Sequence, residues 1–91
     1  AYFFAFAEAM VSGAMELGLS EKDATALTIQ TIIGAAKMLE QSGQTAAVLR
    51  ENVTSPNGTT AAALTSFTNG GLEQLVSKAM KSARDRAQEL A

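Results

Sequence analysis

The residues best suited to chemistry lie together in one short segment, Thr54-Ser55-Pro56-Asn57-Gly58-Thr59-Thr60. Pro56 fixes its own φ and disfavours helical backbone at Ser55, so a helix before this point must end. The Asn57-Gly58 pair tolerates left-handed backbone. Thr59 and Thr60 then offer cap hydroxyls and the free N–H groups of a following helix. Free N–H groups at the positive end of a helix dipole predict a site for a small anion such as a substrate carboxylate.

The same segment has a plainer interpretation. Four hydroxyl groups crowd it, those of Thr54, Ser55, Thr59 and Thr60. Hydroxyls and glycine are also what a well-capped turn between two helices requires, whether or not it binds anything. Spacing alone favours this second interpretation.

Other candidate groups are weaker. The chain has no histidine and no cysteine, which removes the usual zinc sites, thiol nucleophiles and Ser-His pairs. Glu8 and Glu16 lie eight residues apart, near one helical face, but without a third ligand we expect no metal site. Lys37, in apolar surroundings, could serve as a Schiff-base amine, although such a lysine more often snorkels to solvent or pairs with a carboxylate. No glycine-rich loop follows a strand, so no nucleotide-binding fold is expected in this chain.

Composition points to one small domain with too little polar surface. The chain has 91 residues, of which 47% are hydrophobic and 18% charged, against roughly 25% charged in an average soluble domain. A domain of this size has a marginal core of its own. We therefore expect another chain to cover part of its surface.

Charge and hydropathy also exclude some classes of binding partner. The net charge of −2 gives no basic footprint for nucleic acid. The longest weakly charged run, residues 24–39, is shorter than the ~20 residues of a membrane span. The opening residues 1–7 lack the basic region of a signal peptide. We expect a cytoplasmic protein with no nucleic-acid or membrane partner.

Five helices are expected to position the Thr54–Thr60 segment, and no period-two alternation is sustained, so the predicted fold class is all-α. Gly18 is suited to a left-handed cap after the first helix, and Ser20 to an N-cap before the second, which should end before Gly43. The predicted helices cover Tyr2 to Leu17, Glu21 to Ser42, Ala46 to about Asn52, Thr59 or Thr60 to just before Asn69, and Leu72 to Leu90.

The second of these helices suggests self-association. Between Ala24 and Leu39 its only formal charge is Lys37, and a helix that is apolar or small all round is normally buried on all sides. Gly34-Ala35-Ala36 would let another helix approach closely. A central helix in a monomeric bundle is one explanation, but an interleaved dimer fits better because so short a chain has few places to enclose it.

The chain resembles pyrroline-5-carboxylate reductase, an enzyme family of proline biosynthesis, over essentially its whole length. The most specific part is the Thr-Ser-Pro-x-Gly-Thr-Thr block at Thr54–Thr60, after Leu49-Arg50 and Val53 and before Gly70-Gly71. Weaker matches are the opening Ala1-Tyr2-Phe3-Phe4 with Glu8-Ala9, Leu17-Gly18-Leu19, Gln30-Thr31, Gly34–Leu39, and Arg86 with Glu89-Leu90.

The resemblance implies an oxidoreductase that transfers a hydride from NADPH or NADH to 1-pyrroline-5-carboxylate, giving L-proline. It implies an N-terminal Rossmann domain for the cofactor and a helical C-terminal domain that interlocks with a second copy, with dimers assembling into rings. Backbone N–H groups of Gly58, Thr59 and Thr60 would hold the substrate carboxylate. The Thr60 hydroxyl would lie beside the ring nitrogen as the catalytic group, and Ser55 would line the pocket.

Two departures from the family pattern matter. Asn57 stands where the family commonly has glycine, and the cofactor-binding half has no counterpart here. We expect residues 1–91 to be the C-terminal dimerisation and substrate-binding domain, inactive alone because it has no hydride donor. The alternative is a non-catalytic helical self-association module whose turn is only structural.

Overall fold

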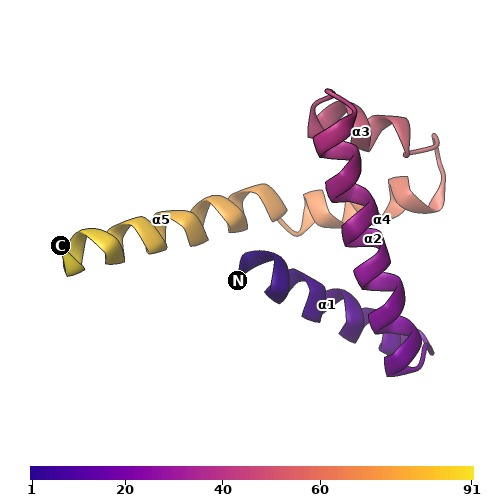
Figure 1. Ribbon diagram of the computed structural model, residues 1–91, viewed down its shortest axis with the longest axis horizontal. Helices are drawn as coiled ribbons and strands as arrows, with labels where there is room; N and C mark the ends of the chain where they lie inside the picture. The colour runs from indigo at the N-terminus through magenta and orange to yellow at the C-terminus, as the bar shows by residue number, and fades with distance from the viewer. The chain divides into compact units, whose positions relative to one another are not determined.

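The computed structural model describes residues 1–91 and contains five α-helices and no strand (Figure 1). The all-α prediction is confirmed, and the predicted helix ends differ from the observed ones by about one residue. The helices are α1 (Tyr2–Glu16), α2 (Glu21–Gln41), α3 (Ala46–Asn52), α4 (Thr59–Asn69) and α5 (Leu72–Leu90). No helix is both long enough and apolar enough to cross a membrane.

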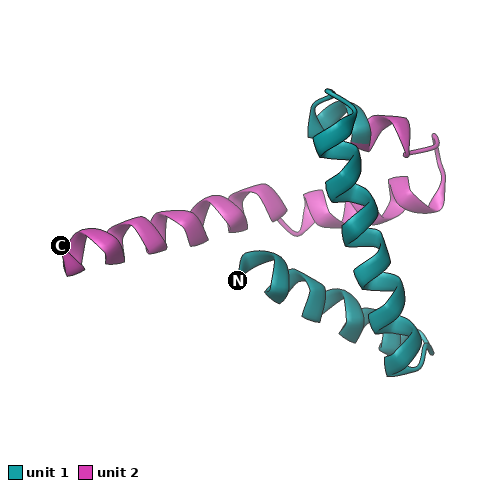
Figure 2. Cartoon of the chain, viewed as in Figure 1, with its two compact units in different colours: residues 1–49 teal, residues 50–91 magenta.

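The chain divides into two compact units (Figure 2). Unit 1 (Ala1–Leu49) holds the α1–α2 hairpin, and unit 2 (Arg50–Ala91) holds the segment Thr54–Thr60, α4 and α5. Within unit 1, α1 packs against α2, and within unit 2, α4 contacts α5.

The turn between α1 and α2 follows the predicted pattern. Gly18 has a φ of +107°, and its N–H donates to the carbonyl of Met15 at 3.0 Å. The N–H of Leu19 donates to the carbonyl of Ala14 at 3.1 Å. These two bonds define a Schellman motif, which satisfies carbonyls at the end of α1. The Ser20 hydroxyl then accepts the N–H of Asp23 at 3.1 Å and caps α2 as predicted.

The next connection is also specified locally. Gly43, just past α2, has a φ of +70°. The Thr45 hydroxyl accepts the N–H of Val48 at 3.2 Å and so caps α3. Short-range bonds of this kind set helix ends without help from a large core.

Helix α2 is not enclosed by unit 1. Only Ala24 and Thr28 of α2 are buried, while Leu27 and Ile29 remain 58% and 52% exposed. Lys37 is exposed as well. Unit 1 is therefore a two-helix hairpin with uncovered apolar faces. A central helix in a monomeric bundle, one of the two explanations offered for α2 above, would need to be surrounded, and unit 1 does not surround it.

We predict opposite effects of alanine at two glycines of unit 1. Gly18→Ala should destabilise the fold by about 1–2 kcal/mol, because an L-residue is strained at this positive φ. Gly13→Ala should stabilise it by up to about 1 kcal/mol, because Gly13 lies inside α1 and an added Cβ would meet nothing within 4 Å. Urea unfolding at one fixed protein concentration measures both changes. Equal effects of the two substitutions would contradict the cap assignment.

Candidate functional site

The segment Thr54–Thr60 lies in unit 2 and connects α3 to α4 through a tight turn. The N–H of Gly58 donates to the carbonyl of Ser55 at 3.1 Å, which closes a four-residue turn. Asn57, its third residue, has a φ of +59°, and Pro56 is its second residue. Proline followed by a residue with positive φ is the pattern of a type II turn. The left-handed backbone predicted for this pair is thus confirmed at Asn57.

Thr54 ties the start of this turn to α3. Its hydroxyl donates to the carbonyl of Arg50 at 2.5 Å, and its N–H donates to the carbonyl of Glu51 at 3.1 Å. Both bonds satisfy carbonyls in the last turn of α3. The Thr54 hydroxyl is therefore engaged in the chain itself, unlike the other three hydroxyls of the segment.

The head of α4 differs from the sequence prediction in its cap. Gly58 is the N-cap, no side chain caps the helix, and Thr59 is already the first helical residue. The expected cap role of the Thr59 and Thr60 hydroxyls is therefore wrong. A cap needs extended backbone one position before the helix, and Gly58 holds that position with φ −86° and ψ −176°.

The free donors at this helix end are also shifted by one residue. The Gly58 N–H, expected to be free for an anion, is bonded to Ser55. The first bond into the helix runs from the Ala62 N–H to the Gly58 carbonyl at 3.2 Å. The N–H groups of Thr59, Thr60 and Ala61 have no acceptor in the chain. The Ala61 N–H was not predicted as a free donor, because the sequence prediction placed the N-cap of this helix on a threonine and not on Gly58.

A side chain at Gly58 would be crowded by its neighbours, although the backbone angles there suit any residue. A Cβ at this position would lie 3.2 Å from the Ser55 carbonyl oxygen and 3.3 Å from the Ser55 Cβ. Ser55, Thr59 and Thr60 are exposed around it. The site therefore offers three unpaired N–H donors and exposed hydroxyls at the positive end of an 11-residue helix, which suits a carboxylate.

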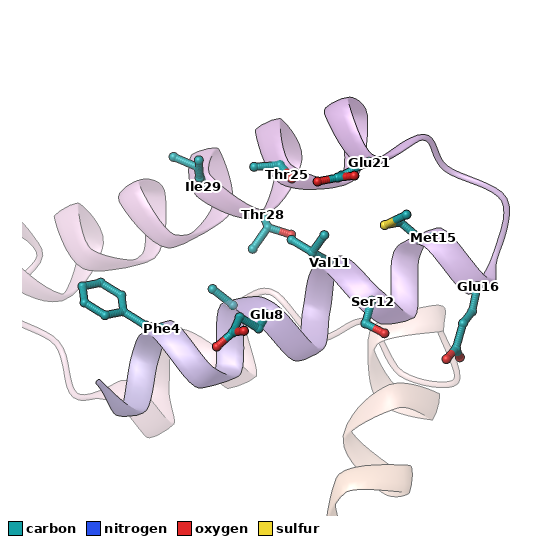
Figure 3. Close-up of a pocket in the computed structure, with 11 residues that line it drawn as sticks. Phe4, Glu8, Val11, Ser12, Met15, Glu16, Glu21, Thr25, Thr28 and Ile29 are labelled. Carbon is teal, nitrogen blue, oxygen red and sulfur yellow. The ribbon is translucent and has the colours of Figure 1, made fainter.

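A second feature is a cleft of about 770 Å³ between α1 and α2 (Figure 3). Phe4, Val11, Met15 and Ile29 contribute its large apolar side chains. Glu8 and Glu16 both line it, as their predicted common face requires, and Glu21 joins them from α2. No three potential metal ligands gather anywhere in the chain.

This cleft was not predicted from the sequence. At helical spacing Phe3, Phe6 and Met10 fall on one apolar face of α1, whereas the cleft uses the neighbouring face, which carries Phe4, Val11 and Met15. These three also follow helical spacing, so the signal was present. Because α1 is apolar on most of its circumference, the pattern alone did not distinguish one face from the other.

A smaller cavity of about 670 Å³ lies in unit 2, where α4 meets the beginning of α5. It combines one cation and one carboxylate with apolar side chains, and its lining residues are Arg50, Leu64, Phe67, Thr68, Leu72, Glu73, Gln74 and Val76. It does not include any residue of the Thr54–Thr60 segment.

These features define an all-α domain with uncovered apolar faces and a threonine-bearing turn at the head of one helix. The family model for pyrroline-5-carboxylate reductase dimerisation matches residues 1–90. This chain belongs to that family.

Individual relatives agree with this assignment. A pyrroline-5-carboxylate reductase of Pseudomonas aeruginosa is 50% identical over 91 residues, which are 100% of this chain and 33% of the relative. A Coxiella burnetii pyrroline-5-carboxylate reductase structure superposes with a TM-score of 0.95 at 42% identity, covering 99% of this chain and 33% of that one. A Plasmodium falciparum pyrroline carboxylate reductase structure with NADP bound gives 0.91 at 30% identity, covering 93% and 32%. The chain thus spans about a third of the length of these proteins.

The turn generates a prediction about Asn57. Asn57→Gly should change the free energy of unfolding by less than about 0.5 kcal/mol, because both residues tolerate positive φ. Asn57→Val should lower it by about 1–2 kcal/mol, because a β-branched residue is strained there. Both changes remove the amide side chain, so equal losses in urea unfolding would show that the amide and not the backbone angle matters.

Proposed function

We propose that this chain is the dimerisation and substrate-binding part of a reductase that converts 1-pyrroline-5-carboxylate to L-proline with NADPH or NADH. The family assignment and the names of the relatives support the reaction class. Since the chain spans about a third of those relatives, the remaining part of such an enzyme would supply a Rossmann domain that binds the cofactor. A relative's structure with NADP bound supports that cofactor class.

The observation that carries the substrate-binding part is the set of unpaired N–H donors at the head of α4. In this proposal the N–H groups of Thr59 and Thr60, with Ala61 beside them, hold the substrate carboxylate. The N–H of Gly58 is bonded within the turn, so it is not one of the donors to the carboxylate. Ser55 lines the same pocket.

Thr60 is the residue of this chain proposed to lie nearest the chemistry. Bound NADPH or NADH would supply the hydride to the C=N carbon. The Thr60 hydroxyl, which makes no hydrogen bond within the chain, would hydrogen-bond the ring nitrogen and orient the imine. An oriented substrate reacts faster because its reacting carbon is held in position.

Self-association is the second part of the proposal, and it would make a homodimer the unit from which larger rings are built. The family's dimerisation model and the exposed apolar residues of α2 support it. A non-catalytic self-association module would need only these apolar faces. That alternative predicts that substitutions in the turn change stability alone and leave catalysis untouched.

A chimeric enzyme tests the catalytic role of Thr60. The matching third of the Pseudomonas aeruginosa relative is replaced by this chain, and reduction of 1-pyrroline-5-carboxylate is followed through NADPH absorbance. Thr60→Ala should raise KM and lower kcat/KM about ten- to a hundredfold, the loss of one charge-assisted contact of about 1.5–3 kcal/mol. Thr60→Ser should keep most of the activity.

Thr65→Ala is the matched control, because Thr65 lies in α4 and its hydroxyl bonds only to the carbonyl of Ala61 at 3.0 Å. Unchanged kcat/KM in Thr60→Ala, or an equal loss in Thr65→Ala, contradicts the proposed role of Thr60.

A further inference from the structure

Asparagine directly before glycine occurs twice in this chain, at Asn57-Gly58 and at Asn69-Gly70. In such a pair the backbone nitrogen that follows the asparagine can attack the side-chain amide, because glycine has no side chain to hinder the approach. The third asparagine, Asn52, precedes the β-branched Val53, which hinders the same attack. The chemistry of the sequence therefore favours the reaction at the two Asn-Gly pairs.

The backbone around Asn57 does little to prevent this attack. Asn57 is exposed, and its φ of +59° is left-handed backbone, which strains a residue that has a Cβ. The attacking group is the Gly58 N–H, which is held by one bond to the Ser55 carbonyl at 3.1 Å. Rotation of a single peptide unit in an exposed turn therefore frees the nitrogen and releases strain.

Asn69 carries the same dipeptide in a more protected place. It is the last residue of α4, and the Gly70 N–H donates to the Ser66 carbonyl at 2.9 Å, as in a continuing helix. Its φ is not positive, unlike that of Asn57, so no strain is released when it moves. Freeing the Gly70 nitrogen requires the end of α4 to unwind. Since Asn69 is also exposed, the backbone and not exposure distinguishes the two pairs.

We propose that Asn57 is a site of spontaneous deamidation and that the carboxylate so formed weakens substrate binding at the head of α4. The Gly58 nitrogen loses its proton and attacks Cγ of Asn57, so that a C–N bond forms and the side-chain amide leaves as ammonia. Water then opens the cyclic imide at one of its two carbonyls. The product is aspartate or isoaspartate at position 57, with one new carboxylate and no change of oxidation state.

The new charge arises beside the donors proposed for the substrate. Position 57 lies two residues before Thr59, and the N–H groups of Thr59, Thr60 and Ala61 have no acceptor in the chain. A carboxylate at position 57 competes with the substrate carboxylate, because the positive end of the helix dipole attracts both. Isoaspartate also adds a methylene to the backbone of the turn that Gly58 closes. The effect on binding rests on the proposed function, whereas the deamidation itself does not.

Mass spectrometry of the aged chain tests the deamidation. The 91-residue chain is kept near neutral pH in buffer and, in parallel, in concentrated urea, and the peptide around each asparagine is followed with time. In urea Asn57 and Asn69 should convert at similar rates, and Asn52 much more slowly. In buffer Asn57 should convert about two- to tenfold more slowly than in urea, the effect of one hydrogen bond. Asn69 should be at least about fivefold slower than Asn57, because only Asn57 releases strain.

Two results would overturn the proposed modification. One is equal conversion of Asn57 and Asn69 in buffer, which would show that the turn gives Asn57 no special reactivity. The other is an unconverted Asn57 in buffer when the urea sample reacts. Raising the pH should speed conversion at Asn57, because the Gly58 nitrogen attacks only after it loses its proton.

Two matched aspartate variants of the chimeric enzyme test the effect on the site. Asn57→Asp should raise KM at least about threefold with little change in kcat, and added salt should reduce this rise by screening the charge. Asn69→Asp places the same charge at the other end of the 11-residue α4, about 15 Å from its head. This distance exceeds the screening length of about 8 Å at physiological salt, so KM should stay unchanged.

Ageing of the chimeric enzyme links the two measurements. The unmodified chimera should lose kcat/KM in step with conversion at Asn57, and the Asn57→Gly chimera, which has no side-chain amide at this position, should keep it. Equal losses in both, or an unchanged KM in Asn57→Asp, overturn the effect on the site, while Thr60→Ala tests the proposed function separately. A chimera without reductase activity contradicts the proposed function, and the mass measurement then still decides the deamidation.

Discussion

The apolar surface that neither unit covers is the constraint on which the rest of this structure depends. Ala24 and Leu49 are the only hydrophobic residues that are buried rather than partly or fully exposed, and no large side chain is fully buried. Burying one Leu, Ile or Phe contributes about 1.5–3 kcal/mol, and ordering each residue costs about 1–2 kcal/mol of backbone entropy. A fold with so little burial of its own requires additional covered surface to be stable. In the proposed homodimer, a second copy supplies this covered surface.

Because tertiary contacts are few, local bonds determine the geometry of the candidate site. The turn is closed by the Gly58-to-Ser55 bond and tied to α3 by Thr54, and all of these partners lie within four residues of each other. The unpaired donors at the head of α4 therefore have a defined direction without support from a core. In the proposed enzyme, their positions relative to a substrate would also depend on the partner chain and on the cofactor-binding domain.

Sequence reasoning predicted most of the helices because their ends carry short-range signals. Gly18 and Ser20 have the expected capping roles, and the left-handed position at Asn57 follows from its residue type. The cap of α4 was predicted wrongly, since Gly58 and Thr59 can both precede a helix and only the backbone distinguishes them. The α1–α2 cleft was missed for a related reason, since two faces of α1 are apolar and packing decides which one faces α2. The roles of Ser55, Thr59 and Thr60 toward a substrate depend on the family resemblance and stay a prediction.

Sedimentation equilibrium of the 91-residue chain over a wide range of concentrations tests the central claim most directly. The account predicts a species of about twice the chain mass of 9.4 kDa at micromolar concentration, with helical circular dichroism lost as dilution produces monomer. A folded 9.4 kDa monomer that keeps its full helical signal at low micromolar concentration would contradict it.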